Sequence, residues 1–294
     1  IGGYRGGTPT TEVLLRWAQF GALSTVMQLG GGGTGDATHH PWDERYDTEV
    51  AIPIYRRYAR LHMRLLPTLE ALVKRAVTTG YAPLLPVGVV AGTEAAWADR
   101  NTFVFGERLL AAPVVEPGAD QRQLVLPAGR WIDWWEPQTW LDGGEHRVAA
   151  PLDHMPLYQR AGSVIALAHP DLMTAVDAAD DSVADPASVG DAIEVRTSPG
   201  PKDVLVLADG TRLVQEPLEQ GMHVLIEQSE ARKMVIHVQF DAAYQAQPEA
   251  LIDGQPVALM ATESDPWTCD SPCYRVDESA LMVTLQGRQL EVRP

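Results

Sequence analysis

The stretch Ile1-Gly2-Gly3-Tyr4 opens the chain as the end of a strand that runs into a glycine loop. A helix is predicted next, with Thr8-Pro9 as its N-cap and first helical position. Its apolar face is expected to consist of residues at helical spacing, namely Val13, Leu14, Trp17, Phe20 and Gly21. The run Ser24–Leu29 then has the character of a short strand. This order of strand end, helix and strand is typical of an α/β fold.

A second, longer helix is predicted after a polar loop. Its apolar stripe comprises Ile52, Tyr55, Ala59, His62, Leu65, Leu66, Leu69 and Val73. Gly80 follows the last turn and is the expected C-cap residue, because glycine adopts the left-handed backbone at no steric cost. The α/β part therefore ends at about residue 80.

Short apolar runs separated by Gly/Pro turns fill the rest of the chain, which is typical of β-sandwiches. The first set is Phe103–Phe105, Leu109–Val115, Gln123–Leu126 and Ser163–Leu167. A stretch rich in Ala, Asp and Pro from about 168 to 190 has the composition of a linker. The second set is Val204–Leu207, His223–Glu227, Met234–Phe240 and Leu281–Leu285. We therefore predict three parts: an α/β fragment (1–80), a proximal β-sandwich (81–168) and a distal β-domain (169–294).

The composition narrows the class of partner. The 294 residues are 45% hydrophobic and 21% charged, as in ordinary globular proteins. No apolar run approaches the roughly 20 residues that span a bilayer, so no membrane span is expected. The net charge of −16 argues against nucleic acid, because phosphate binding relies on clustered Lys and Arg. A neutral substrate fits this balance.

The two cysteines, Cys269 and Cys273, lie close together around a proline. A local disulfide is one interpretation and two free thiols is the other. A disulfide would indicate a periplasmic or secreted protein. No metal is expected, because neither the cysteines nor the pair His39-His40 has further ligands at suitable spacing.

Loops that follow parallel strands carry the active sites of α/β barrels. By that rule the loops Gly2–Thr8 and Gly30–Glu44 are the candidates. The second holds side chains suited to hydrogen-bonding and stacking a sugar: Asp36, His39, His40, Trp42, Asp43 and Glu44. The alternative is a solvated, Gly-rich loop. Four tryptophans could likewise form a carbohydrate platform or anchor the sandwich, and we favour the anchor: Trp131, Trp134, Trp135 and Trp140.

Six segments, in order, resemble the C-terminal half of glycoside hydrolase family 31, the α-glucosidase and α-xylosidase family. They are Ile1–Tyr4, Arg16–Ala22, Arg64–Pro67, Phe105–Val114, Leu126–Trp135 and Pro156–Ser163. The resemblance implies the C-terminal portion of a (β/α)8 barrel followed by two β-sandwich-like domains. Because no initiator Met or signal-peptide pattern precedes Ile1, we expect this chain to be the later part of a longer enzyme.

The resemblance also implies retaining hydrolysis of α-glycosidic bonds by two aspartates, without metal or organic cofactor. In the family both aspartates lie upstream of the Ile-Gly-Gly segment. The motifs that carry them, Trp-x-Asp-x-Asn-Glu and Gly-Asp-Asn, do not occur in this sequence. The expected partners are therefore a carbohydrate substrate and an N-terminal catalytic segment in the same or another chain, with an oligomer possible. The alternative is a non-catalytic carbohydrate-binding or scaffolding protein derived from this half.

One departure from the family concerns the sugar subsite. Where the family often has Met-Arg-x-His, this chain has Met27-Gln28-Leu29-Gly30. Either a nearby histidine replaces the missing contact, or the subsite accepts a different sugar. His40-Pro41-Trp42 falls near the family's Glu-Pro-Trp, and Tyr4 matches its pocket aromatic. The predicted substrate-binding residues are Tyr4, Gln28, Asp36, His39, His40 and Trp42.

Overall fold

The computed structural model describes two compact units. The described residues are 1–3, 9–30, 39–219, 221–227, 233–240, 249–252, 255–256, 258–259, 267, 273–277, 280–285 and 289–293. Unit 1 consists of Ile1–Met63, Ala82–Ala128 and Asp142–Tyr158. Unit 2 consists of Arg64–Tyr81, Gly129–Leu141 and Gln159–Pro294.

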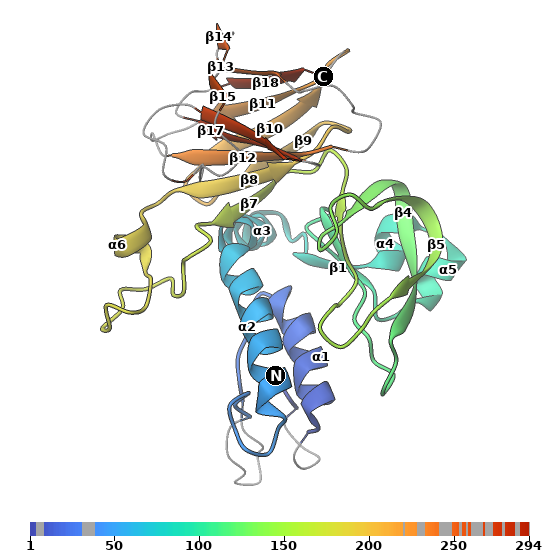
Figure 1. Ribbon diagram of the computed structural model, residues 1–294. Helices are drawn as coiled ribbons and strands as arrows, with labels where there is room; N and C mark the ends of the chain where they lie inside the picture. Colours follow the sequence, from blue (N-terminus) through green and yellow to red (C-terminus); the bar gives the residue numbers. More distant parts are fainter. Residues whose placement is uncertain are drawn as a thin grey trace. The chain divides into compact units, whose positions relative to one another are not determined.

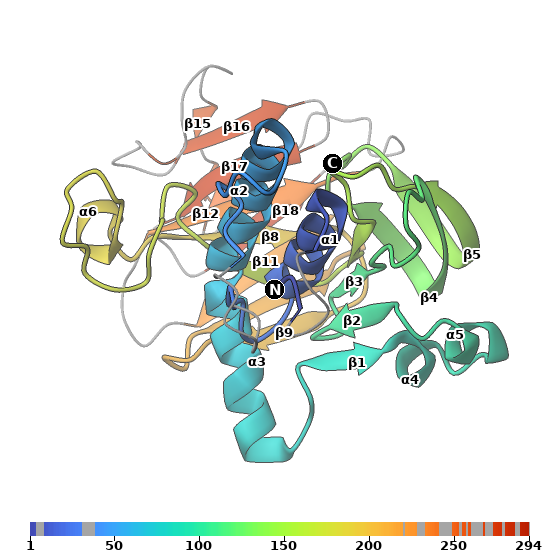
Figure 2. The same ribbon diagram turned by 90° about the horizontal axis from the view of Figure 1, so that it is seen from below.

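Two helices of the N-terminal α/β part, α1 (Thr11–Ala22) and α2 (Thr48–Arg64), lie side by side (Figures 1 and 2). Helix α1 begins later than predicted, because Thr10 and not Thr8 is its N-cap. The hydroxyl of Thr10 accepts a hydrogen bond from the backbone N–H of Val13 at 3.2 Å. The C-terminal end of α1 is joined to α2, since His62 Nδ1 lies 3.1 Å from the carbonyl oxygen of Ala22.

The apolar face predicted for α1 is wrong in most of its members. The side chains buried in α1 are Leu14, Leu15, Arg16, Ala18, Gln19 and Ala22. Val13, Trp17 and Phe20 are instead 41%, 46% and 40% exposed. Two stripes at helical spacing run along this helix, and unit 1 covers only one of them.

The single long helix predicted after the polar loop is two helices, α2 and α3 (Leu66–Thr79). Pro67 contributes to the break, because proline has no N–H to donate to the preceding turn and fits without cost in the first turn of a new helix. Gly80 caps α3 with φ of 74°, which confirms the predicted C-cap.

The predicted strand Ser24–Leu29 is wrong for the described structure, where Ser24 and Thr25 lie in a bend and residues 26–29 have no regular secondary structure. The backbone nitrogen of Ile1 donates a hydrogen bond to the carbonyl of Gln28 at 2.8 Å. A contact of this kind joins neighbouring strands, but one bond alone does not make a ladder.

The proximal β-region forms a six-stranded sheet in the order β1-β2-β3-β6-β4-β5. Its strands are β1 (Leu84–Pro86), β2 (Phe103–Phe105), β3 (Leu109–Ala111), β4 (Gln121–Asp133), β5 (Trp140–Ala149) and β6 (Leu157–Arg160). Two short helices, α4 (Val87–Ala91) and α5 (Glu94–Ala98), follow β1. Trp131 is fully buried and Trp134 is 9% exposed. Burial of these two tryptophans favours the anchoring role over a carbohydrate platform.

Unit 2 contains two further six-stranded sheets, which Figure 1 shows as two layers. The first has the order β14-β13-β18-β11-β10-β9 and the second β15-β16-β17-β12-β8-β7. Their bounds are β7 (Ile165–Ala168), β8 (Ile193–Thr197), β9 (Asp203–Val206), β10 (Arg212–Pro217), β11 (Met222–Glu227), β12 (Met234–Gln239), β13 (Glu249–Ile252), β14 (Gln255–Pro256), β15 (Ala258–Leu259), β16 (Cys273–Asp277), β17 (Ala280–Leu285) and β18 (Gln289–Arg293). Between the layers lies a core of aliphatic side chains that includes Val195, Leu213, Val224, Ile236 and Leu290.

Helix α3 covers the edge strand β7. The Thr68 hydroxyl donates to the carbonyl of Ala166 at 2.7 Å and accepts from its N–H at 2.9 Å. An exposed strand edge would offer these groups to another chain, so this contact protects the edge. The linker predicted after residue 168 contains only the short helix α6 (Pro186–Val189). No helix in the described part of the chain is long and apolar enough to cross a membrane.

Candidate functional site

His39 is the most firmly placed of the predicted site residues. Its side chain is 2% exposed, and its Nδ1 lies 3.0 Å from the hydroxyl of Tyr46. The ring also lies against the backbone of Gly2, where a Cβ atom would come within 2.9 Å of His39 Cδ2. Gly2 has φ of +87°, so glycine serves there both for space and for backbone conformation. These contacts hold the imidazole in one orientation.

The position of Tyr46 follows from the way α2 begins. Asp47 precedes the helix, and its carboxylate accepts from the N–H of Val50 at 3.4 Å. Tyr46 and Ala51 share a buried cluster with Leu14, which is the arrangement of a hydrophobic staple. The N–H of Asp47 also donates to the hydroxyl of Thr11 at 3.0 Å, so the starts of α1 and α2 are joined. Burial raises the pKa of Tyr46, which keeps the phenol protonated.

His40 and Trp42 form a stacked pair beside this buried site. Their ring centroids are 4.6 Å apart, with planes 15° from parallel. Trp42 is 61% exposed, so much of the indole remains available to a ligand. Flat aromatic faces of this kind pack against the apolar C–H faces of sugar rings, while nearby polar atoms bind hydroxyl groups.

Asp43 follows the stacked pair and is held by Arg45. One carboxylate oxygen lies 2.6 Å from Arg45 Nη2, and the other accepts from the Arg45 N–H at 3.1 Å. The hydrogen bonds from Arg45 lower the pKa of Asp43 to about 2. Asp43 is therefore an ionised acceptor at neutral pH and a poor general acid.

Gln28 is the remaining predicted substrate-binding residue within the described part of the chain, and its side chain is not brought into this arrangement. The Gln28 side chain is exposed, and only its backbone carbonyl takes part, by accepting from Ile1. Tyr4 and Asp36 lie outside the described residues, as does Cys269. Cys273 is described only as the first residue of strand β16. Among the described residues, no group of three or more His, Cys, Asp or Glu side chains could hold a metal ion.

Tyr46 is not among the residues predicted from the sequence, although the sequence around it contains a pattern that indicates a buried position. An aromatic residue before an acidic N-cap, with a small apolar residue five positions later, matches the staple pattern. That pattern places the phenol at the start of α2. It does not reveal that His39 would be the hydrogen-bond partner, because the path of the intervening loop decides this.

Comparison with known protein families gives two adjacent matches. Residues 1–72 match the model described as the glycosyl hydrolases family 31 TIM-barrel domain. Residues 86–165 match the glycosyl hydrolase family 31 C-terminal domain. Together the two matches cover more than half of the chain, and the described part of the candidate site falls within the barrel match.

Similar proteins include glycosidases that are named for different substrates. Alpha-glucosidase 2 of Bacillus thermoamyloliquefaciens is 30% identical over 171 residues, which cover 57% of this chain and 21% of the relative. An alpha-xylosidase of Saccharolobus solfataricus is 25% identical over 232 residues, 76% of this chain and 29% of the relative. This chain thus aligns with less than a third of either protein.

A solved structure shows the same fold over nearly the whole chain. The family 31 dextranase of Flavobacterium johnsoniae, complexed with glucose, superposes with a TM-score of 0.78 at 19% identity. The match covers 97% of this chain and 37% of the dextranase. The architecture is therefore the C-terminal portion of a (β/α)8 barrel followed by β-sandwich-like domains.

Proposed function

Because this chain belongs to glycoside hydrolase family 31, we propose that it forms part of a retaining α-glycosidase acting on α-glucoside- or α-xyloside-type substrates. The observation that supports this proposal is the match of residues 1–72, which include His39, His40 and Trp42, to the TIM-barrel domain of the family. In the retaining mechanism one carboxylate attacks the anomeric carbon and forms a glycosyl-enzyme intermediate. The other protonates the leaving oxygen and then activates water.

Both catalytic carboxylates belong, in this proposal, to barrel strands upstream of residue 1. The acid/base residue of such an enzyme must hold a proton near neutral pH. Asp43 is unsuited to that role, because its hydrogen bonds with Arg45 keep it ionised. Retaining enzymes also place their two carboxyl groups about 5–5.5 Å apart across the bond, whereas Asp43 and Glu44 are neighbours on one turn.

This chain would supply part of the substrate-binding surface. The exposed face of Trp42 packs against a sugar ring, and His40 supports the indole from its other side. His39, held by Gly2 and Tyr46, keeps the start of this turn in place. From the sequence we also propose Tyr4, Gln28 and Asp36 as substrate-binding residues.

We also propose the three-part division into residues 1–80, 81–168 and 169–294. The barrel match ends at residue 72 and the C-terminal domain match at residue 165, which supports boundaries close to these. The first part would contribute substrate contacts, and the two β-domains would stabilise the barrel.

The test uses the intact polypeptide that contains residues 1–294 and the upstream barrel strands. We expect turnover of an aryl α-glucoside or α-xyloside, with an α-anomeric first product by proton NMR. Replacing Trp42 by alanine should lower kcat/KM about 10- to 100-fold through the loss of ring stacking, equivalent to about 1.4–2.7 kcal/mol. The matched control is Trp97→Ala, because Trp97 is also an exposed tryptophan, at 57%, on α5.

Three results would reject parts of this proposal. Turnover by residues 1–294 alone would place the catalytic groups inside this chain. Inversion at the anomeric carbon would reject the retaining mechanism. Sugar binding without any turnover by the intact polypeptide would favour the alternative, a non-catalytic carbohydrate-binding protein.

A further inference from the structure

The imidazole of His39 is fixed on two sides of its ring. Nδ1 lies 3.0 Å from the Tyr46 hydroxyl, and Cδ2 lies against the backbone of Gly2. The backbone N–H of His39 also donates to the carbonyl of Gly30 at 3.3 Å, which holds the main chain at the same point. Because the side chain is 2% exposed, a ligand can reach no more than one edge of this ring.

Hydrogen-bond accounting assigns the tautomer of this imidazole. Tyr46 is 5% exposed, and burial raises its pKa, so the hydroxyl keeps its proton. A buried hydroxyl proton needs an acceptor, and among the described residues His39 Nδ1 is the acceptor within reach. Nδ1 therefore accepts from Tyr46 and carries no proton itself. In a neutral imidazole the proton then lies on Nε2, which becomes a donor.

The resulting Nε2–H group has no acceptor within the part of the chain that the structure describes. Nε2 is bonded to Cδ2, so it lies on the side of the ring next to Gly2. A nearly buried N–H without an acceptor is costly, and an oxygen from a ligand or a water removes that cost. The stacked pair of His40 and Trp42, to which the proposed function assigns the sugar, follows directly in the chain.

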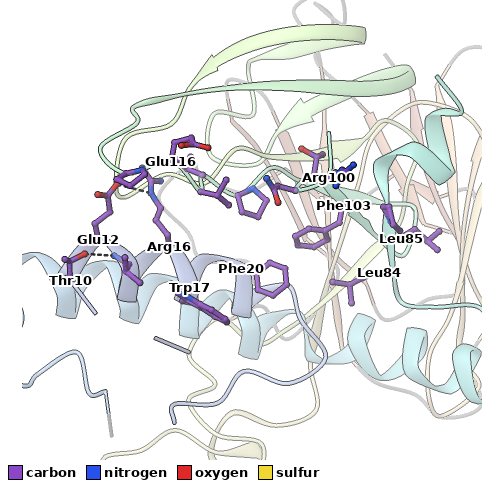
Figure 3. Close-up of a pocket in the computed structure, with 18 residues that line it drawn as sticks. Thr10, Glu12, Arg16, Trp17, Phe20, Leu84, Leu85, Arg100, Phe103 and Glu116 are labelled. Carbon is purple, nitrogen blue, oxygen red and sulfur yellow. Dashed lines mark hydrogen bonds and ion pairs between the residues drawn. The ribbon is translucent and has the colours of Figure 1, made fainter. Parts of the chain in front are cut away.

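The pocket beside α1 is a weaker candidate for a sugar. It has a volume of about 820 Å³ and is bordered by α1 and β1 (Figure 3). Its polar groups nearest α1 already have partners, because Glu12 accepts from the N–H of Gly118 and Arg16 donates to the carbonyl of Ala150, both at 3.0 Å. Sugar recognition requires free hydrogen-bonding groups among apolar faces, and the Nε2–H of His39 is such a group.

We propose that Tyr46 is a positioning residue that holds His39 as the Nε2–H tautomer, and that this N–H donates a hydrogen bond to an oxygen of the sugar. The inference rests on the proposed function, which places a sugar at this turn, and it adds the donor atom and the residue that sets it. A fixed donor binds an oxygen lone pair and repels a protonated amine. The subsite therefore selects a hydroxyl or anionic substituent over an ammonium group at that position of the sugar.

Nitrogen NMR of the intact polypeptide tests the tautomer. The protein carries isotopically labelled histidine, and the His39 signals are those lost in His39→Gln. At mildly alkaline pH, where imidazoles are neutral, we expect the wild type to carry its proton on Nε2 and Tyr46→Phe to show a mixture of both tautomers. The matched control is Tyr55→Phe on α2, because the Tyr55 hydroxyl has no hydrogen-bond partner among the described residues. A proton on Nδ1 in the wild type, or an unchanged tautomer in Tyr46→Phe, would overturn the proposal.

Sugar titration of the same labelled protein tests the contact itself. Glucose or xylose should shift the Nε2–H signal of His39 and leave the signals of His237, which pairs with Glu194 in unit 2, in place. If neither sugar moves the His39 signal while an aryl α-glycoside is turned over, the sugar contact is overturned and the proposed function stands. A shifted signal in a protein without turnover would reject the proposed function and leave the positioning inference intact.

A double-mutant cycle separates positioning from simple packing. For an aryl α-glucoside or α-xyloside, Tyr46→Phe should lower kcat/KM about three- to tenfold, the size of one hydrogen bond, and Tyr55→Phe should not change it. In the His39→Gln background, Tyr46→Phe should cause no further loss, because the ring that it orients is gone. Losses that add fully in the double variant would show that Tyr46 does not act through His39.

Discussion

Gly2 determines where the ring of His39 can lie. At φ of +87°, a residue with a side chain pays about 1–2 kcal/mol for the left-handed backbone. At Gly2 a Cβ atom would also press on the imidazole at 2.9 Å from Cδ2. The substitution Gly2→Ala therefore strains the backbone and displaces His39 from Tyr46.

We expect Gly2→Ala to lower the free energy of unfolding by about 2–3 kcal/mol, since a steric term adds to the backbone term. The control is Gly118→Ala, because Gly118 has φ of +69° and a Cβ atom added there would meet no other atom within 4 Å. In the Gly118→Ala variant the free energy of unfolding should fall by only about 1 kcal/mol. Urea unfolding measures both, and equal losses would show that contact with His39 contributes nothing.

Glu194 is the centre of a buried ionic cluster in unit 2. It is 6% exposed, forms an ion pair with Arg64, and lies 3.0 Å from His237 Nδ1. Arg196, on the same strand, stacks on Trp134 at 3.9 Å from the ring centroid. Burial acts to raise the pKa of Glu194, but the hydrogen bond from His237 and the charges of both arginines outweigh it. The pKa of Glu194 falls to about 2.

This depressed pKa gives stability a defined pH dependence. The unfolded carboxyl titrates near pH 4.5, so the stabilisation is fully present above that value and is lost as the pH falls toward 2. Glu194→Gln should cost about 3 kcal/mol at pH 7, because it leaves buried positive charge uncompensated. The cost should shrink between pH 4.5 and 2. Urea unfolding at several pH values measures it.

The control for this prediction is Glu216→Gln. Glu216 pairs with Lys202 on the surface, where their side chains are 33% and 58% exposed, so the loss should stay below about 1 kcal/mol. A difference between wild type and Glu194→Gln that does not change from pH 7 to pH 3 would contradict the assigned titration.

Helix α1 is fastened to the loop after β5 by two buried polar side chains. Arg16 donates to the carbonyls of Ala150 and Pro151 at 3.0 and 3.2 Å. Gln19 donates to the carbonyl of Leu152 at 2.6 Å. Buried carbonyls must find donors, so these side chains fix the loop against the helix.

We expect Arg16→Met to lower the free energy of unfolding by about 2–3 kcal/mol, because the methionine keeps the packing volume but removes every donor. Hydrogen exchange should quicken in residues 150–153. Arg57→Met is the matched control, since Arg57 reaches the same loop through Asp153 at 3.8 Å but is 37% exposed. It should change stability by less than about 1 kcal/mol. Similar losses in both variants would contradict a special role for Arg16.

The elements that could be predicted from sequence are those fixed by local pattern. The strand Phe103–Phe105 has the predicted bounds, and Gly80 caps α3 as expected. The buried stripe of α1 could not be identified in the same way. Leu14 on the buried stripe and Trp17 on the exposed stripe each have apolar neighbours at helical spacing. Which stripe is buried depends on the neighbouring element and not on periodicity.

In the candidate site, too, local sequence pattern predicts some residues, whereas tertiary contacts decide how they interact. His39, His40 and Trp42 were predicted from residue type and position in a loop, and the structure places all three around one turn. The hydrogen bond between His39 and Tyr46 could not be predicted. It depends on the return of the chain to the start of α2, which is a tertiary contact.

At the scale of the whole molecule, the excess of acidic groups governs association between copies. The net charge is −16 at pH 7, and the isoelectric point calculated from the sequence is about 4.8. Copies of the 294-residue polypeptide repel one another at neutral pH, but this repulsion disappears near the isoelectric point. Apolar contacts, including those of the exposed stripe on α1, then act unopposed.

We expect light scattering from this polypeptide to rise steeply as the pH falls from 7 to about 4.8, and to rise at pH 7 when added salt screens the repulsion. Far-UV circular dichroism should remain native at pH 4.8, because Glu194 stays ionised until the pH approaches 2. Scattering should also fall again below the isoelectric point, where the net charge turns positive. A rise that coincides with loss of the circular dichroism signal would instead assign association to unfolding, and would contradict control by net charge.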